Sequence, residues 1–500
     1  MVFNNSLLLG AGGQGGAATF DTTLIPNSVW LDGSADYLTR TPSGAGNRTR
    51  WTIAWWFQLN SISTEMVFFS ANSGSNEFRI ALESAGQMMV QDDNASMNRQ
   101  TSMLFRDVGW YHCIVSYDSN QSIASDRVRV YVNGELQSLV SGSAAEPSSG
   151  GETFWNNNQA NEIGRRSRTT SVYMKAYMAQ ICFLNADSIQ NGDVSVSDFL
   201  DTFTLGTNGS QFIPKKNSEI AALATTAGGN SFCLDFADSS DLGNDISSNN
   251  NDFTPNSMAS ANQSTNTPSK TYSTFNPLAH ADNSYPGTFT LSEGNQKNVI
   301  NSSNTSVKTT VPFLMSGSNI IRAQFTFSTL GDGGCGITGS SHTAGTYHTA
   351  GNSIAGRGEV GLCGNGALVI DGNFNNSYTS ALSNGDVVDV IVNCDVGAVY
   401  FAVDGTLLGG ATQSEILAGT TTNAALVSSF VRRTAGEVFN FYAFQFNPTS
   451  TTIEYNSGQS SFTHSYSTIT SLKSLNTADL PAPDYQGIDY FDATLYEGNG

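Results

Sequence analysis

The chain has 500 residues and a formal net charge of −20, and Asp, Glu, Lys and Arg make up only 13% of it. Since a single hydrophobic core stops growing at about 250–300 residues, this length predicts two domains. The acidic balance excludes a nucleic-acid-binding role, because that role needs a basic face that displaces counterions from phosphates. No stretch reaches the roughly 18 apolar residues of a membrane span. The N-terminus lacks the basic region of a signal peptide, so we expect no secretory export.

The composition favours strands over helices. Asn, Ser, Thr and Gly are abundant, and they favour strands joined by tight turns. With 39% hydrophobic and 10% aromatic residues, the chain can still build cores. The cysteines show no metal-ligand spacing, so we expect them to be buried free thiols. Free thiols suit a protein that is assembled in a reducing cytoplasm. They are Cys113, Cys182, Cys233, Cys335, Cys363 and Cys394.

Residues 1–28 are rich in Gly, Ala, Asn and Thr and contain little that can pack. We expect them to form an arm that docks on another protein and becomes ordered there. Within this arm, Gly10–Gly15 has the spacing of a dinucleotide-binding loop. The residues that follow would make a poor helix, and no strand–helix–strand unit comes after them, so we expect no such cofactor.

The first domain is expected over residues 29–245. Asn133-Gly134 between two strand-like runs predicts a hairpin, and alternation in Tyr173–Leu184 favours a strand over a helix. Large aromatic side chains should fill or line the first core, namely Trp51, Trp55, Phe57 and Trp110. Further strands are expected at Trp51–Leu59, Phe78–Leu82, Met88–Gln91, Trp110–Tyr117, Arg127–Val132, Glu135–Val140 and Ser231–Phe236.

The second domain is expected over residues 288–470, after a polar linker at 246–287 that shows no periodicity. Residues 471–500 should form a C-terminal connector. Strands are expected at Ile320–Phe327, Val387–Asn393, Val399–Val403 and Val438–Phe446, with a hairpin at Asp404-Gly405. No stretch keeps a 3.6-residue apolar period. The sequence thus predicts an all-β protein of two tandem antiparallel, jelly-roll-type sandwiches.

The sequence contains only weak matches to the motifs of known catalytic sites. Glycoside hydrolysis requires two carboxyl groups about 5–9 Å apart, which a strand supplies at positions i and i+2. No two Asp or Glu residues are two positions apart, although carboxylates of separate strands could still meet. The nearest approach to a serine nucleophile motif, Gly351–Ala355, lacks its closing Gly. We therefore expect a binding protein rather than an enzyme, with a carbohydrate-active enzyme as an alternative.

Candidate ligand-binding residues lie in expected loops, because sandwiches carry recognition on the loops at their ends. Aromatic rings and guanidinium groups suit contacts with sugars or proteins. The longest such loop, residues 339–358, carries His342, Tyr347, His348 and Arg357, and Trp155 and Tyr173 mark a comparable region in the first domain. The basic run Arg165–Arg168 is expected to be a solvated turn.

One acidic stretch is a weak calcium candidate. Asp235, Asp238, Asp241 and Asp245 lie close together in the sequence, and carboxylate oxygens are the ligands that Ca²⁺ takes. Their spacing matches no EF-hand, and Asp-rich clusters are also common in structural turns. The turn interpretation is favoured, and calcium stays open.

Several short motifs of the first domain occur together: Asp32-Gly33, Tyr37-Leu38, Trp51–Ile53, Trp110–His112 leading to Tyr117-Asp118, Val128–Gly134, Glu162–Gly164 and Tyr177–Ala179. With these motifs the first domain resembles concanavalin-A-like, laminin-G-like lectin sandwiches. The second domain has Asn384–Val387, Val399–Gly405 and Tyr455–Gln459 before Phe462. With these it resembles a SPRY-type sandwich, although Ser457-Gly458-Gln459 stands where that family usually has Phe-Gly-Gln.

The tandem order of these two domains is similar to that of proteins of tailed bacteriophages. The resemblance implies a virion protein that is assembled in the host cytoplasm, most often a tail fibre or adhesin that binds host-surface glycans or proteins. It also implies contact with other virion proteins through residues 1–28 and, by analogy with fibres, a homotrimer. A capsid decoration or head-fibre protein with a structural role is the alternative.

Overall fold

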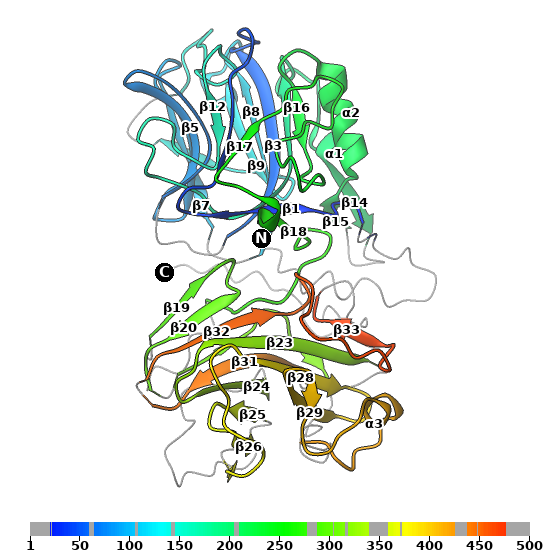
Figure 1. The fold of residues 1–500 in the computed structure, drawn as a ribbon. Helices are drawn as coiled ribbons and strands as arrows, with labels where there is room; N and C mark the ends of the chain where they lie inside the picture. The colour runs from blue at the N-terminus through cyan, green and yellow to red at the C-terminus, as the bar shows by residue number, and fades with distance from the viewer. Residues whose placement is uncertain are drawn as a thin grey trace. The chain divides into compact units, whose positions relative to one another are not determined.

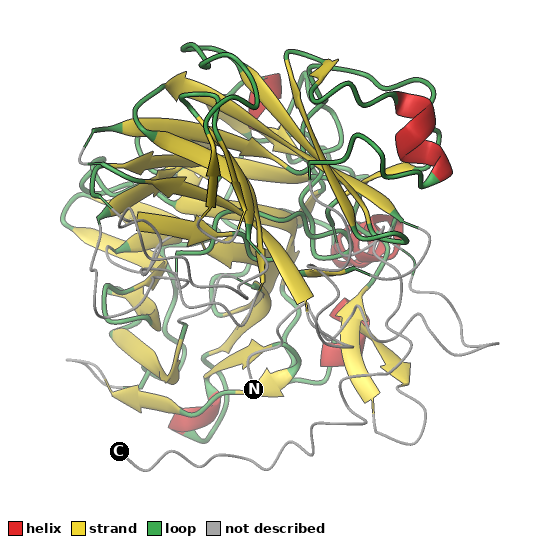
Figure 2. Cartoon of the chain, turned by 90° about the horizontal axis from the view of Figure 1, so that it is seen from below, coloured by secondary structure: helices red, strands yellow, loops and turns green. Residues whose placement is uncertain are grey.

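The computed structural model describes residues 21, 23–59, 65–105, 109–141, 146–204, 210–277, 288–303, 305–315, 319–339, 359–370, 373–425, 438–447 and 449–476. The described part of the chain divides into two compact units, residues 21–270 and residues 271–476. Strands dominate both units, with a few short helices (Figure 2). The expected class, two tandem β-sandwiches, is confirmed.

The described residues of the first unit form two large antiparallel sheets that face each other (Figure 1). Sheet A contains, in spatial order, β10 (Glu135–Leu136), β9 (Val128–Val132), β8 (Trp110–Asp118), β3 (Arg50–Leu59), β13 (Lys175–Asn185), β1 (Ser28–Asp32) and β18 (Gln263–Ser264), with β16 (Phe232–Leu234) paired to β13. Sheet B contains β11 (Leu139–Ser141), β7 (Met97–Leu104), β6 (Gln87–Asp92), β5 (Asn76–Leu82), β4 (Met66–Ser73), β12 (Asn161–Ile163), β2 (Tyr37–Arg40) and β17 (Thr254–Asn256).

Aromatic side chains of β3 fill the space between these sheets. Trp51, Trp55 and Phe57 are fully buried in the main core, as predicted. Alternate residues of a strand point to opposite faces, so Trp56 points to the outer face of sheet A. There it packs with Trp110 and Tyr177 in a smaller buried cluster. Both faces of β3 are therefore covered, which explains why its sequence is apolar almost throughout.

The outer face of sheet A is covered by elements that the sequence analysis did not predict. These are α1 (Val196–Phe199), α2 (Asn217–Ala227) and the hairpin of β14 (Leu200–Thr204) and β15 (Ser210–Pro214). Ile220 and Ala224 of α2 pack in one apolar cluster with Leu184 of β13. The helix has eleven residues and its apolar positions are mostly alanine, so its periodic signal is weak. A short 3₁₀ helix, Ala124–Asp126, precedes β9, and another, Ser260–Asn262, precedes β18.

The predicted linker is wrong over its first part, because residues 246–270 belong to the first unit. β17 pairs with β2 and β18 pairs with β1, so this polar segment extends both sheets. Phe253 is buried in the main core. Hydrogen bonds also hold the polar side chains of residues 246–270: the Asn266 amide, for example, donates to Gln58 Oε1 over 2.6 Å. The expected arm also ends earlier, since Ile25 is buried and its N–H donates to Ser269 Oγ.

The described residues of the second unit form another pair of sheets (Figure 1). Sheet C contains β19 (Phe289–Ser292), β20 (Lys297–Ile300), β32 (Thr451–Asn456), β23 (Ile320–Thr329), β28 (Val387–Asn393), β29 (Ala398–Val403) and β30 (Thr406–Leu407), with β33 (Leu472–Ser474) beside β23. Sheet D contains β21 (Thr305–Lys308), β31 (Val438–Gln445), β24 (Gly333–Gly339), β25 (Val360–Cys363), β26 (Leu368–Ile370) and β27 (Asn373–Asn375), with β22 (Phe313–Leu314) beside β31.

The second unit departs from the prediction at its C-terminal boundary. β33 pairs with β23 in parallel, whereas the other pairings between the described strands are antiparallel. Leu475 is fully buried, so the unit extends past the expected boundary at residue 470. The helix α3 (Gln413–Ala418) contributes Ile416 to an apolar cluster with Ile391 and Tyr400.

Two turns confirm the hairpin predictions. Asn133 and Gly134 both have positive φ between β9 and β10, and Asp404 and Gly405 have positive φ between β29 and β30. Such paired positive φ values match the right-handed twist of the flanking strands. The single strand expected at Glu135–Val140 is wrong: β10 ends there in sheet A and β11 begins in sheet B.

Candidate functional site

Trp155 is not a surface residue, which corrects the prediction that it contacts a ligand. Its side chain is buried in the core between sheets A and B. The ring lies 5.8 Å from Phe69, 5.6 Å from Phe78 and 5.9 Å from Phe183, measured between ring centroids. The polar neighbours of Trp155 in sequence predicted a loop, but a loop can still direct one large apolar side chain into a core.

The acidic stretch does not fit a calcium site. Asp238 and Asp241 accept hydrogen bonds from the N–H groups of Ser240 and Gly243, and Asp235 accepts one from the N–H of Ala237. Asp245 is buried and accepts from the N–H groups of Cys233, Ser247 and Asn251. Asp235, Asp238 and Asp241 thus serve local turns, whereas Asp245 also joins β16 to the segment that follows it. Among the described residues, no three His, Cys, Asp or Glu side chains converge as metal ligands would.

The other expected loop follows β24. His342, Tyr347, His348 and Arg357 lie outside the described residues. They remain predictions from the sequence.

Tyr173 belongs to a short hairpin, residues 165–173, that runs over the outer face of sheet B. Arg165 and Tyr173 form an antiparallel bridge, and the Arg166 N–H donates to the Val172 carbonyl over 2.9 Å. Ser70 of β4 ties the hairpin to the sheet, because its hydroxyl donates to the Arg165 carbonyl over 2.6 Å. Val172 packs on an apolar cluster of the strands beneath it.

Arginine and glutamate side chains surround this hairpin in matched pairs. Arg165 donates two hydrogen bonds to Glu162, over 2.7 and 2.5 Å. Arg166 donates to both carboxylate oxygens of Glu77, which is itself buried. The bidentate geometry fixes the planes of both guanidinium groups. The side chains of Arg165 and Arg166 are only 15% and 17% exposed, so the expectation of a solvated turn is wrong here.

The pairing extends to the neighbouring strands. Arg79 of β5 donates to Glu65 and Gln91 and lies 3.6 Å from Glu77. Arg168 is the most open of these arginines: its side chain is 40% exposed, and its nearest carboxylate oxygen, on Glu77, is 3.8 Å away. We call this surface the arginine face; it comprises Tyr37, Glu65, Glu77, Arg79, Glu162, Arg165, Arg166, Arg168 and Tyr173.

Two tyrosines complete the arginine face. The Arg165 guanidinium carbon lies 3.6 Å from the centre of the Tyr37 ring, a cation–π contact. The rings of Tyr37 and Tyr173 are 6.4 Å apart, and both side chains are half-buried. The hydrogen bonds that Arg165 donates to Glu162 raise the pKa of Arg165, so its charge is permanent. Arg165 therefore contacts the Tyr37 ring and also interacts with the Tyr173 side chain.

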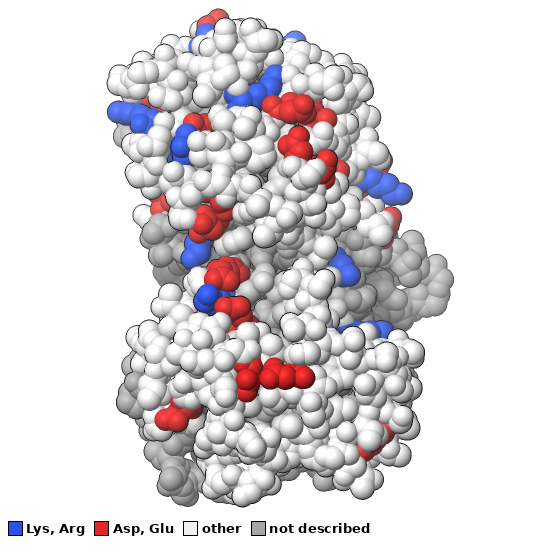
Figure 3. Space-filling model, viewed as in Figure 1, with Lys and Arg blue, Asp and Glu red and all other residues white. Residues whose placement is uncertain are grey.

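The electrostatics of this face favour uncharged ligands. Four guanidinium groups, of Arg79, Arg165, Arg166 and Arg168, lie within 4 Å of the carboxylates of Glu65, Glu77, Glu83 or Glu162. An anionic ligand would have to displace a glutamate from an arginine, which costs a charge-assisted hydrogen bond. Charged side chains are sparse on the surface seen in Figure 3, and several blue groups there lie beside red ones. The arrangement suits hydroxyl-rich sugars or the polar surface of a protein.

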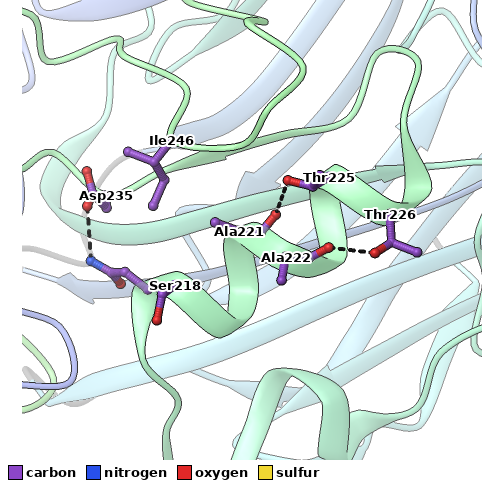
Figure 4. Close-up of a pocket in the computed structure, with 8 residues that line it drawn as sticks. Ser218, Ala221, Ala222, Thr225, Thr226, Asp235 and Ile246 are labelled. Carbon is purple, nitrogen blue, oxygen red and sulfur yellow. Dashed lines mark hydrogen bonds between the residues drawn. The ribbon is translucent and has the colours of Figure 1, made fainter.

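A groove of about 590 Å³ runs along α2 (Figure 4). Two of its hydroxyl groups are engaged within the helix: Thr225 and Thr226 donate to the carbonyls of Ala221 and Ala222. Among the lining residues only Asp235 has an ionisable side chain, and the Asn217 amide donates to it over 3.4 Å. This groove therefore lacks the paired groups that acid–base catalysis requires.

The chain was compared with known proteins. Residues 32–186 match the family model of the concanavalin A-like lectin/glucanases superfamily. No curated protein sequence matches the chain. No helix within the described residues is long and apolar enough to cross a membrane.

Similar solved structures include domains LG4-5 of the mouse laminin α1 chain, at 11% identity over 84% of this chain and 82% of that one, with a TM-score of 0.27. A heptameric SAP-like pentraxin from Limulus polyphemus is 13% identical over 37% of this chain and 84% of its own, with a TM-score of 0.27. The CBM40 of the Ruminococcus gnavus IT-sialidase is 12% identical over 31% of this chain and 91% of its own, with a TM-score of 0.22. Residues 32–186 of the first unit are therefore similar to the concanavalin A-like lectin/glucanases superfamily, and the two facing sheets of this unit agree with that similarity.

Proposed function

We propose that the protein is a virion appendage of a tailed bacteriophage, a fibre or adhesin, and that its first unit binds glycans or proteins of the host surface. The lectin-type domain at residues 32–186 supports a binding role. The order of a lectin-like sandwich followed by a SPRY-like sandwich supports the virion assignment through the resemblance described above. Residues 1–20, the part of the predicted arm that lies outside the described residues, are the proposed anchor on other virion proteins.

The arginine face is the observation that carries the binding role. Tyr37 and Tyr173 present half-buried rings whose positions are fixed by Arg165 and Glu162. Rings that are already ordered lose little conformational entropy when a ligand stacks on them. Arg168 adds an exposed donor group at the turn of the same hairpin. Rigid rings next to hydrogen-bonding groups are the usual composition of a sugar or protein contact.

A binding experiment with the full-length chain tests this assignment. The chain is applied to immobilised host-surface polysaccharide and to a glycan array, and the same measurement is made on Tyr173→Ala and Arg168→Ala. We expect each substitution to weaken binding by about 10-fold, the effect of losing one good contact. Arg129→Ala is the matched control, since Arg129 pairs with Asp126 on sheet A, away from the arginine face.

Circular dichroism must show that the variants remain folded. Undiminished binding by both arginine-face variants would exclude this surface as the binding site. Release of reducing sugars from the polysaccharide by the purified chain would instead favour the hydrolase alternative.

A further inference from the structure

Two of the cysteines lie directly opposite each other on neighbouring strands. Cys182 of β13 and Cys233 of β16 are register partners in an antiparallel ladder. The backbone of Cys233 is bonded away from β13: its N–H donates to Asp245 Oδ1 over 2.8 Å, and its carbonyl accepts from the N–H of Ile246 over 2.9 Å. The two cysteines therefore form a non-hydrogen-bonded pair.

This type of pair brings side chains close together. In antiparallel sheets the Cα atoms of a non-hydrogen-bonded pair are about 4.5 Å apart, at the lower end of the roughly 4.4–6.8 Å range that a disulfide spans. Both side chains point to the same face of sheet A, because both belong to the apolar cluster beneath α2. The Cys182 thiol lies 3.9 Å from the Ile220 carbonyl of α2. The pKa of Cys233 is raised well above its usual value, mainly by the contact with the Cys182 thiol and secondly by burial.

We propose that Cys182 and Cys233 form a cross-strand disulfide when the folded protein meets an oxidising environment. The inference is independent of the proposed binding function. In the strand pairings of the described residues no other two cysteines face each other, and Cys113, for example, faces Trp55 and Val132. Cys335 and Cys363 belong to clusters on opposite faces of sheet D, and Cys394 lies in the main core of the second unit.

The reaction is thiol–disulfide exchange with a small-molecule disulfide such as oxidised glutathione. The thiolate of one cysteine attacks the reagent, forms a mixed disulfide and releases one glutathione thiolate. The thiolate of the other cysteine then attacks the protein sulfur of that mixed disulfide and releases the second glutathione. The protein loses two protons and two electrons, and the reagent is reduced to two thiols.

The groove along α2 offers a route for the reagent. Ala221 and Ile246 line this groove and also belong to, or pack against, the apolar cluster that contains both sulfurs (Figure 4). Both thiols are fully buried. The exchange therefore requires an opening of this cluster, and it should accelerate under conditions that loosen α2.

The disulfide would fasten β16 to sheet A. β16 pairs with β13 through only three residues, and the bond would close a loop that contains α1, the β14–β15 hairpin and α2. Closing a loop of roughly 50 residues restricts the unfolded chain considerably. We expect the unfolding temperature of the oxidised protein to rise by roughly 5–10 °C.

The test starts from the reduced full-length chain. It is incubated with oxidised glutathione, in native buffer and in urea below the unfolding midpoint, then denatured and alkylated. Mass spectrometry should find alkyl groups on four of the six cysteines and a peptide that links Cys182 to Cys233. Cys113→Ala is the matched control and should still lose two alkylation sites, whereas Cys182→Ala and Cys233→Ala should each keep all five.

Full alkylation of all six cysteines under both conditions would overturn the proposal, as would a disulfide between any other pair. A correctly linked peptide without a reversible rise in unfolding temperature would confirm the bond and refute the stabilising role. Because glycan binding is measured separately on the arginine-face variants, neither result depends on the other.

Discussion

The carboxylate of Asp92 joins two segments that are far apart in the sequence, because its Oδ2 accepts a hydrogen bond of 2.7 Å from the backbone N–H of Phe154. Its Oδ1 accepts a second hydrogen bond, of 2.8 Å, from the N–H of Ala95. The side chain is fully buried. Burial outweighs these hydrogen bonds and raises the pKa of Asp92 to about 7. The end of the sandwich near Trp155 thus depends on a carboxyl group that titrates near neutral pH.

This raised pKa predicts a pH-dependent stability. The folded state binds the proton more tightly than the unfolded state, so the contribution of Asp92 is complete below about pH 4 and is lost as the pH rises through 7. The loss should be on the order of 2–4 kcal/mol in the free energy of unfolding. Urea unfolding of the wild type and Asp92→Asn at pH 4.5 and 7.5 measures it. The stability difference between them should shrink at the higher pH; parallel pH profiles would contradict the assignment.

Trp155→Ala should reduce stability rather than binding. Removing a buried tryptophan leaves a cavity and costs about 3–5 kcal/mol. Urea unfolding measures this loss, and Trp155→Phe, which keeps a ring against Phe78 and Phe183, should cost less. Glycan binding by the folded fraction should be unchanged. A large loss of binding with normal stability would restore Trp155 as a ligand contact.

The second unit contains a buried ion pair beneath residues 462–466. Arg322 Nε lies 3.5 Å from Asp389 Oδ1, and both side chains are almost completely buried. The Tyr466 hydroxyl donates to Asp389 over 2.8 Å, and Arg322 donates to the His464 carbonyl over 2.8 Å. Burial raises the pKa of Asp389 and lowers the pKa of Arg322.

Removing one partner of this pair should be costly. Asp389→Ala leaves the Arg322 charge buried without a counter-ion, and we expect a loss of about 3–5 kcal/mol. The double variant Arg322→Met, Asp389→Leu removes both charges and should recover most of that loss. Hydrogen–deuterium exchange in β23 reports the change locally. Equal losses in the single and double variants would show that the charge pairing is not responsible.

The glycines of β24 should tolerate no side chain. A Cβ atom on Gly336 would lie 1.9 Å from the Val360 carbonyl oxygen of β25, so the two strands would have to separate. Gly336→Ala should therefore cost about 3 kcal/mol or more. Gly44→Ala is the control, because a Cβ there meets nothing within 4 Å. Thermal unfolding compares the two variants, and equal melting temperatures would refute the packing argument.

Local patterns identified much of the fold. The apolar runs that became β3, β8, β23, β28 and β31 were predicted within one or two residues, because a strand buried on both faces shows in the residue types themselves. Both hairpin turns were predicted from Asn133-Gly134 and Asp404-Gly405, since the positive φ that these turns need restricts the residues that can occupy them. β24 was missed because glycine is depleted in strands, and here it leaves room for Val360 and Phe444.

The candidate site depended on long-range packing. Arg165, Glu162 and Tyr173 are close in the sequence, but Glu77 and Tyr37 come from other strands, and nothing in the local pattern pairs them. The same is true of Cys182 and Cys233, which are 51 positions apart in the sequence and become neighbours only through the register of β13 and β16. Residue type limits which contacts a side chain can make, whereas strand register, set by the burial of two whole faces, decides which contacts form.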